Sequence, residues 1–223
     1  MGVLGNHQYA VVTGDVVGYT GLPEDERVGI IDVLRHAHAE VLRHLGDHAS
    51  TALDVFRGDS WQFVLSAPDQ SLRAALLFRA IVISRSLDTR LAIGIGTVDF
   101  LPSAGVPTGD GEAFRSSGEA LDGMLRGERM VIRSQGLIGS MDQATLDVLI
   151  ALLDALVSSW TPRQAAAVSG ALMGLSQNTM ASGWEGGAIS QQAVAQHLDR
   201  ARWNAVARAL QHFEGQFGGR GES

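Results

Sequence analysis

Two kinds of hydrophobic pattern divide this sequence near residue 136, and this division constrains the fold more than any single residue does. Before that point, short β-branched apolar runs alternate with stretches whose apolar residues recur at helical spacing. After it, only the helical spacing is found. The first pattern predicts a sheet covered by helices and the second a separate helical region. We therefore expect one domain at residues 1–135, a helical domain at 136–214 and a disordered tail at 215–223.

The first region predicts the order β-α-β-β-α-β, followed by one more helix and one more strand. This is the order of the ferredoxin-like split-βαβ fold, in which the middle hairpin lies beside the first strand. The expected fold class is therefore α+β, a ferredoxin-like palm followed by an all-helical domain. The expected strands cover 9–13, 51–56, 61–65, 90–98 and 129–132, and the expected helices cover 23–46, 68–87 and 112–125.

The composition excludes several kinds of chemistry. There is no cysteine, so disulfides, thiolate zinc sites and cysteine nucleophiles are excluded. All 17 basic residues are arginines, so a Schiff-base lysine and a P-loop lysine are excluded as well. No apolar run reaches the roughly 18 residues of a membrane span. We expect a soluble cytoplasmic protein with no membrane partner.

The net charge of −7 is unevenly distributed. Residues 1–135 carry 17 acidic and 12 basic side chains, whereas residues 161–213 carry 2 acidic and 4 basic ones. The acidic first region suits a metal site. The weakly basic last region is mildly suited to nucleic acid.

Two Gly-Asp pairs mark the place where we expect chemistry. Asp15 ends the first expected strand, and Asp59 lies in the turn of the hairpin. In a split-βαβ sheet these positions are neighbours, so two hard oxygen ligands converge beside a loop with free backbone amides. That arrangement is typical of a magnesium–phosphate site. Aspartates next to glycine also commonly cap turns, and this structural role remains an alternative.

Four histidines lie on or just after the first expected helix: His36, His38, His44 and His48. The spacing of the last two, four residues apart, can bind zinc, but the sequence places no third ligand nearby. We interpret them as part of a solvated helix face flanked by arginines.

The segments around the two aspartates resemble the motifs of class III nucleotide cyclases. Residues 14–20 (GDVVGYT) are similar to the Asp-Ile-x-Gly-Phe-Thr motif after the first strand of that family, and residues 56–60 (FRGDS) to its Gly-Asp hairpin. Residues 90–96 resemble its Arg-x-Gly-Ile strand, and residues 109–123 its Gly-x-x-Val-Asn-x-Ala-x-Arg helix. The resemblance spans about 120 residues with the motifs in the same order.

The resemblance implies a site for a nucleoside triphosphate with Mg²⁺ or Mn²⁺. In that family two aspartates hold the metal ions, and a glycine-aromatic-threonine loop surrounds the phosphates with backbone amides. The implied ligands are Asp15, Asp59 and the Val16 carbonyl for the metal, and Gly18, Tyr19 and Thr20 for the phosphates.

The sequence departs from the family at positions that matter for catalysis. Val55 stands where the base-reading lysine is expected, and Arg115 and Glu119 stand where the transition-state asparagine and arginine are expected. Losing these groups removes substrate discrimination and stabilisation of the developing charge, so conventional cyclase activity is not expected. In an active enzyme of altered specificity, Arg57 and Arg115 would replace the missing charges.

Nearly the whole chain resembles the SatD-like family, which joins a cyclase-like half to a C-terminal helix-turn-helix. Residues 91–96 (LAIGIG) correspond to its Gly-Ile-Gly-Ile-Gly strand, and residues 108–114 (TGDGEAF) to its Gly-Ala-Asp-Gly-Pro-Ala-like turn. The resemblance implies a supporting helix at 161–174, a first motif helix at 176–181 and a recognition helix at 190–202. The apolar pattern continues this last helix to Phe213.

The recognition helix would read base edges with hydroxyl and amide groups and hold DNA phosphates with arginines. The alternative is a helical bundle used for dimerisation, because the span at 182–187 exceeds the usual three- to four-residue turn. The candidate DNA-binding residues are Ser190, Gln191, Gln192 and Gln196 for bases, and Arg200 and Arg202 for phosphates.

Three functions remain open from the sequence. The first is a regulatory DNA-binding protein whose degenerate cyclase-like domain senses a nucleotide or metal ion. The second is an active nucleotidyl cyclase or transferase of altered specificity. The third is a dimerisation module without a ligand. We expect a homodimer, because cyclase domains pair and helix-turn-helix modules usually bind two half-sites.

Overall fold

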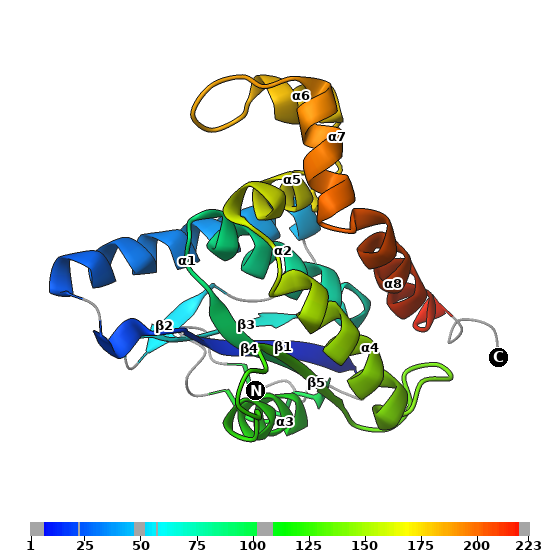
Figure 1. Ribbon diagram of the computed structural model, residues 1–223. Helices are drawn as coiled ribbons and strands as arrows, with labels where there is room; N and C mark the ends of the chain where they lie inside the picture. Colours follow the sequence, from blue (N-terminus) through cyan, green and yellow to red (C-terminus); the bar gives the residue numbers. More distant parts are fainter. Residues whose placement is uncertain (1–6, 22, 47–51, 57, 102–108, 219–223) are drawn as a thin grey trace.

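A single five-stranded sheet forms the centre of the molecule (Figure 1). The computed structural model describes residues 7–21, 23–46, 52–56, 58–101 and 109–218. Within them the strand order is β2-β3-β1-β4-β5. The strands are β1 (Gln8–Val16), β2 (Asp54–Phe56), β3 (Ser60–Leu65), β4 (Thr89–Thr97) and β5 (Met130–Ser134).

The strand pairing has the predicted split-βαβ topology. The central strand β1 pairs antiparallel with β3 on one side and with β4 on the other. The hairpin partner β2 pairs with β3 at one edge, and β5 lies parallel to β4 at the other. The predicted α+β fold class and the position of the hairpin beside the first strand are therefore confirmed.

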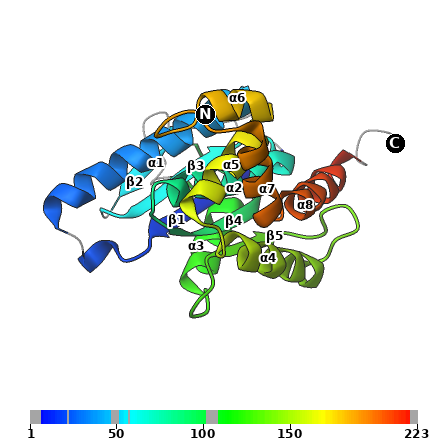
Figure 2. The same cartoon turned by 45° about the horizontal axis from the view of Figure 1, so that its top comes forward.

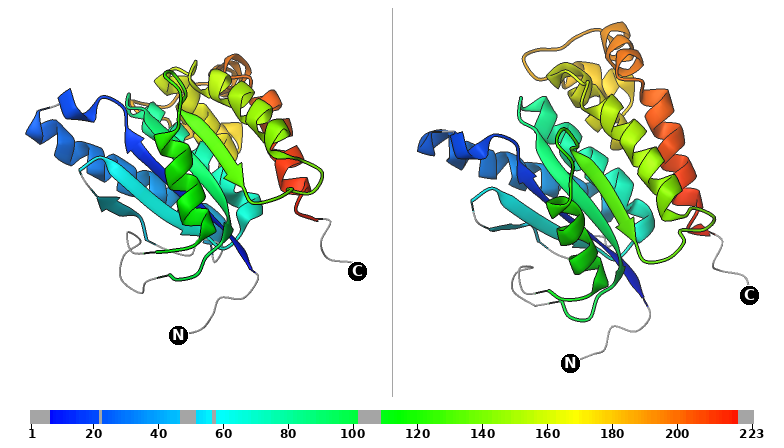
Figure 3. Two further views of the ribbon diagram at one scale, coloured as in Figure 1. Left: turned by 90° about the horizontal axis from the view of Figure 1, so that it is seen from below. Right: turned by 60° about the horizontal axis from the view of Figure 1, so that its bottom comes forward.

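Helices cover both faces of this sheet, which explains why β1 is apolar on both sides. Ala10 and Val12 belong to the buried cluster that includes α1 and α2, whereas Tyr9 and Val11 pack with Ala113 of α3. Figure 3 shows α3 lying across the face opposite to α1 and α2. These helices are α1 (Glu24–Leu45), α2 (Ser71–Ser84) and α3 (Glu112–Asp122).

The packing of α3 on β4 depends on a glycine. A Cβ atom at Gly94 would lie 2.2 Å from the Ala113 carbonyl oxygen and 2.6 Å from the Ser117 nitrogen. No side chain fits there, so the helix backbone rests directly on the strand. Gly94 is therefore a packing residue.

The remaining helices stack on the α1–α2 side of the sheet and along the β5 edge (Figure 2). α4 packs on β5, α5 packs on α2, and α6 and α7 pack on each other. Arg73 of α2 forms an ion pair with Glu214 of α8 at 2.7 Å, so the last helix returns to the palm. These helices are α4 (Gln143–Val157), α5 (Pro162–Leu172), α6 (Gln177–Ser182), α7 (Gln191–Arg200) and α8 (Trp203–Gly215).

One cluster of buried apolar side chains includes members of both regions, from Val12 of β1 to Leu153 of α4 and Phe213 of α8. Within the described ranges, no helix combines the length and the apolar character needed to cross a membrane. Residues 219–223 of the predicted tail lie outside those ranges. Just before them, the ring of Phe217 packs edge-on against Phe213, with ring centroids 5.4 Å apart.

The continuous helix predicted at 190–213 is wrong, because the structure contains two helices there. α7 ends at Arg200, and Arg202 adopts a left-handed conformation with φ 57°. The indole nitrogen of Trp160 donates a buried hydrogen bond of 3.0 Å to the Ala201 carbonyl. This distant donor satisfies a carbonyl at the break, and periodicity cannot reveal such a partner.

The predicted solvated face for the four histidines is wrong for His38. Its side chain is buried in α1, and its ring centroid lies 5.1 Å from that of Phe63 in β3. His36 is half exposed and lies 4.0 Å from Glu40, as expected for a surface residue. His48 lies outside the described residues.

Candidate functional site

The end of β1 meets the hairpin turn and the start of β4 at one end of the sheet. Asp15 lies opposite Ser60 of β3 and opposite Arg90 of β4, and Asp59 immediately precedes Ser60. Gly14 allows this convergence, because a Cβ atom there would lie 2.4 Å from the ring of Trp61. The topology thus brings the two predicted aspartates to one place.

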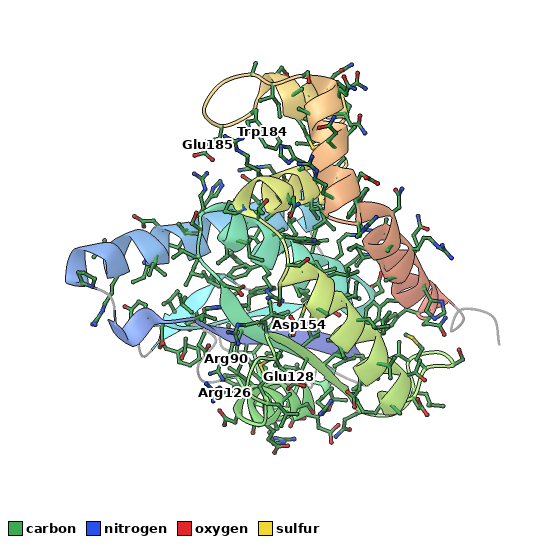
Figure 4. The ribbon with its side chains drawn as sticks, in the orientation of Figure 1. Arg90, Arg126, Glu128, Asp154, Trp184 and Glu185 are labelled. Atoms are coloured by element: carbon green, nitrogen blue, oxygen red, sulfur yellow. The ribbon has the colours of Figure 1, made fainter. Side chains whose placement is uncertain are left out.

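Both aspartates line a hollow of about 250 Å³ at this end of the sheet. Two arginines line it as well, Arg90 of β4 and Arg129 just before the adjacent strand β5, together with the turn that follows β1. Figure 4 shows Arg90 at this end of the molecule. The lining residues are Asp15, Val16, Val17, Gly18, Tyr19, Asp59, Arg90 and Arg129.

Arg90 forms a bidentate ion pair with the Asp15 carboxylate. Arg90 donates from Nε to Oδ1 at 2.9 Å and from Nη2 to Oδ2. The hydrogen bond to Asp15 raises the pKa of Arg90, as do the negative charges of Asp15, Asp122 and Asp59, against the opposing effect of burial. Arg90 therefore holds its charge firmly at this end of the sheet.

The predicted metal ligands Asp15 and Asp59 lie beside two arginines in this arrangement. Both oxygens of Asp15 are bound by Arg90, which leaves Asp59 as the other carboxylate of the hollow. In the part of the chain that the structure describes, no group of three or more His, Cys, Asp or Glu side chains could hold a metal. The two guanidinium groups instead offer positive charge and directed donors, which suit an anion.

The turn after β1 packs against the hairpin turn. Gly18 has φ +77°, a conformation that favours glycine. The ring of Tyr19 lies over Gly58, and the Arg27 guanidinium lies 5.3 Å from the centre of that ring. Thr20 lies in the short 3-10 helix η1 (Tyr19–Gly21), and its side chain is outside the described set. Gly18 and Tyr19, the predicted phosphate ligands, thus line the hollow beside the two aspartates.

A residue of the helical region binds Arg129, the second arginine of the hollow. The backbone N–H of Arg129 donates to the Asp154 carboxylate of α4 at 2.8 Å, and its Nε lies 3.7 Å from Asp88. The backbone carbonyl of Asp88 accepts from the Val17 N–H at 2.9 Å. Contacts from α4 therefore reach the strand end that carries Arg129 and the turn that follows β1.

A completely buried arginine, Arg79 of α2, is at the centre of these contacts. It donates to Asp154 at 2.6 Å, to Ser158 at 2.9 Å, and to both oxygens of Asp88 at 3.0 and 3.3 Å. Helices α2 and α4 and the residues just before β4 and β5 thus share one charge network, which we call the Arg79 network: Arg79, Asp88, Arg129, Asp154 and Ser158.

The structure does not bring Arg115 to the hollow. Arg115 donates to Asp110 at 2.7 Å, and Asp110 pairs with Phe100 beyond the far end of β4. Arg57 lies outside the described residues. Glu119 lines a different groove, between α3 and α4.

Sequence reasoning missed Arg90 and Arg129 as members of the site. A signal for both was available, because each directly precedes an apolar run that predicts a strand. Since β4 and β5 are parallel neighbours, with Leu91 opposite Met130, the two arginines share one end of the sheet. Recognising them required knowing which strands are adjacent.

The candidate DNA-binding residues lie just before α7, on it and just after it, and all of them are exposed. Ser190 is the N-cap of α7, and its hydroxyl accepts from the Ala193 N–H at 3.1 Å. The opposite face of α7 is buried through Val194 and Leu198. The other exposed candidates are Gln191, Gln192, Gln196, Arg200 and Arg202.

Comparisons with solved structures give distant likenesses only, of which one example follows. The crystal structure of the guanylyl cyclase Cya2 superimposes with a TM-score of 0.42 and 16% sequence identity, over 56% of this chain and 74% of that chain. No protein-family model matches the chain, and no curated protein matches it. The fold assigned above depends on the strand pairings of this chain itself.

Proposed function

We propose that the hollow at the end of the sheet binds the phosphate groups of a nucleotide, and that the chain is a nucleotide-sensing protein with a degenerate cyclase-like domain. The observation that carries this proposal is that Arg90 and Arg129 line one hollow together with Asp15, Asp59 and the turn after β1. Guanidinium groups recognise phosphate through charge and paired donors. Any Mg²⁺ or Mn²⁺ would arrive with the nucleotide.

The sensing part of the proposal rests on the Arg79 network. Asp154 of α4 binds the backbone of Arg129 and the side chain of Arg79 at once. A ligand that draws Arg129 toward its phosphates would therefore act directly on α4, the first element of the helical region. This contact gives ligand binding a physical route to that region.

A conventional cyclase is not the proposed activity. Val55 is paired within the β2–β3 hairpin, and Arg115 is engaged by Asp110. Neither supplies the hollow with the missing catalytic groups, so we expect little or no cyclic nucleotide from ATP or GTP. Robust magnesium-dependent synthesis that Asp59→Ala abolishes would instead support the enzyme of altered specificity.

A thermal-shift screen of nucleoside triphosphates, each with and without Mg²⁺ or Mn²⁺, tests the binding proposal. A ligand at 100 times its dissociation constant adds about 2.7 kcal/mol of stability. Arg129→Gln should weaken binding about tenfold, because it removes one charged donor while the backbone bond to Asp154 remains. Arg126→Gln, in the same loop but outside the hollow, is the matched control. No shift with any triphosphate would favour the dimerisation module.

Asp59→Asn separates an anion site from a metal-assisted one. If the phosphates bind the arginines directly, removing this carboxylate lowers repulsion and strengthens binding without metal. If a metal ion bridges Asp59 and the phosphates, the same variant weakens binding and removes its metal dependence. The two mechanisms thus predict opposite signs in a single titration by calorimetry.

We also propose, as a second function, that α7 contacts DNA in a homodimer, as the resemblance of the C-terminal region to a helix-turn-helix implies. The supporting observation is that the amide side chains Gln191, Gln192 and Gln196 share an exposed helix with Arg200. Gln192→Ala should lower discrimination at one base pair per half-site by about 1–3 kcal/mol, and Arg202→Ala should weaken binding to all sequences. A monomer at micromolar concentration by sedimentation, or no selected sequence, would contradict this proposal.

A further inference from the structure

A second cleft, of about 530 Å³, lies between the palm helices and the helical region. Its walls come from α1 and α2 on one side and from α5, α6 and the following glycine-rich segment at 183–187 on the other. Figure 4 shows Trp184 and Glu185 of that segment on the side that faces α5. The cleft shares no lining residue with the hollow that contains Asp15. Clefts of this size between packed units are common ligand sites.

Apolar side chains form much of the inner surface of the cleft. Ile81 and Met180 are buried in its walls, and Leu175 and Trp184 lie toward the outside. Gly170 forms part of the wall, and Met180 packs directly on it, because a Cβ atom there would lie 2.3 Å from the Met180 sulfur. Methionine and tryptophan side chains make an adaptable surface for flat apolar groups.

Trp184 is held in place by a ring stack. Its indole lies nearly parallel to the ring of His197 in α7, with centroids 5.5 Å apart and planes inclined by 12°. Burial lowers the pKa of His197, and the positive charges of Arg163 and Arg200 lower it further. The stack thus fixes one wall of the cleft before any ligand arrives.

The charges around the cleft are nearly all paired. Arg85 of α2 binds Glu185 at 2.6 Å, and Glu40 of α1 pairs with Arg43 and lies 4.0 Å from His36. Arg163 of α5 is the exception. Within the described residues, it forms no ion pair or hydrogen bond, so its guanidinium remains available to a ligand.

We propose that this cleft binds a small amphipathic anion, with a flat apolar body against Met180 and Trp184 and one anionic group on Arg163. The apolar walls account for the body, and the unpaired guanidinium accounts for a single negative charge. This site is independent of the phosphate site proposed above, since the two share no residue. A ligand here would contact α2, α5 and the segment before α7 together.

Two matched fluorescent probes test the proposal on the full chain. Anilinonaphthalene sulfonate has an apolar ring body with one sulfonate, and phenylnaphthylamine has the same body without the charge. We expect the sulfonate to bind about tenfold more tightly than the neutral probe, as a charged hydrogen bond implies. Arg163→Gln should remove that difference and leave the neutral probe unaffected. Arg208→Gln, at an exposed arginine of α8, should change neither.

A filling variant locates the binding site. Ala166 lines the cleft, so Ala166→Trp should abolish binding of both probes, while Ala205→Trp on the exposed face of α8 should not. Circular dichroism and urea unfolding confirm that each variant is folded. The proposal is overturned if neither probe binds the unmodified chain, if Ala166→Trp leaves binding intact, or if the two probes bind equally tightly.

Discussion

Most helices of the C-terminal region begin in a different way from those of the palm, α8 being the exception. Each helix from α4 to α7 is preceded by a side chain that accepts a hydrogen bond from the N–H three residues later, which satisfies a free donor of the first turn. Before α2 and α3 no side chain does so. The four capping residues are Asp142, Thr161, Ser176 and Ser190.

This contrast shows that the two regions differ in how far along the chain the residues that position their helices lie. The helices α4 to α7 are delimited by residues inside their own sequence. The palm helices are positioned by partners far along the chain, such as the Asp154 carboxylate 75 residues from Arg79 and the Ala113 backbone against Gly94. Substitutions in the palm should therefore act on the whole fold, and cap substitutions on one helix.

The largest effect should come from Arg79→Met. The variant keeps an apolar stem of similar length but leaves the Asp88 and Asp154 carboxylates without their shared partner. Removing one member of a buried ion pair costs about 3–5 kcal/mol. Urea unfolding measures the loss. Arg85→Gln breaks an exposed pair with Glu185 and should cost at most about 1 kcal/mol. Equal effects of the two variants would refute the long-range role of Arg79.

Gly94→Ala should cost about 1–3 kcal/mol, because the added methyl group pushes α3 away from β4. Gly118→Ala, within α3, is the control. A Cβ atom there meets nothing within 4 Å, so alanine should stabilise the helix by about 0.5–1 kcal/mol. Thermal unfolding of both variants should give shifts of opposite sign. A neutral Gly94→Ala would show that the close contact is not needed.

Ser176→Ala should cost about 1 kcal/mol through loss of the cap on α6. Hydrogen exchange should become faster mainly at the first turn of α6, and little in the sheet. Ser176→Asp retains a capping oxygen and should restore protection. Faster exchange throughout the palm would contradict the local character of the cap.

The smallest effect concerns the charge of the exposed Asp142 cap. Hydrogen bonds from the Thr145 hydroxyl and N–H lower the pKa of Asp142. A lowered pKa in the folded state means that the carboxylate stabilises the fold above its ordinary pKa, and that this contribution disappears as pH falls through the folded value. Asp142→Asn keeps a capping oxygen, so the two proteins should differ at neutral pH and converge in acid. Unfolding curves from about pH 6 to pH 2 measure this convergence.

The sequence predicted only part of the candidate site, because part of that site depends on contacts between segments that are distant in the chain. Asp15 and Asp59 converge because the order of strands places the hairpin beside the first strand, and that order is visible in the hydrophobic pattern. Arg90 and Arg129 join them because β5 pairs with β4, and no local pattern reports that pairing. Arg115 lies away from the site because of where α3 packs, and no local pattern reports that position either.

By itself, the sequence determined the succession of strands and helices as far as α7, and the convergence of the two aspartates. These features arise from periodicity and turn chemistry, which act between residues close in the chain. Only the tertiary structure decided that His38 is buried, that Trp160 satisfies the break after α7, and that Arg79 binds α4. Each of these depends on which distant segment packs alongside, since burial and hydrogen-bond partners are properties of neighbours in space.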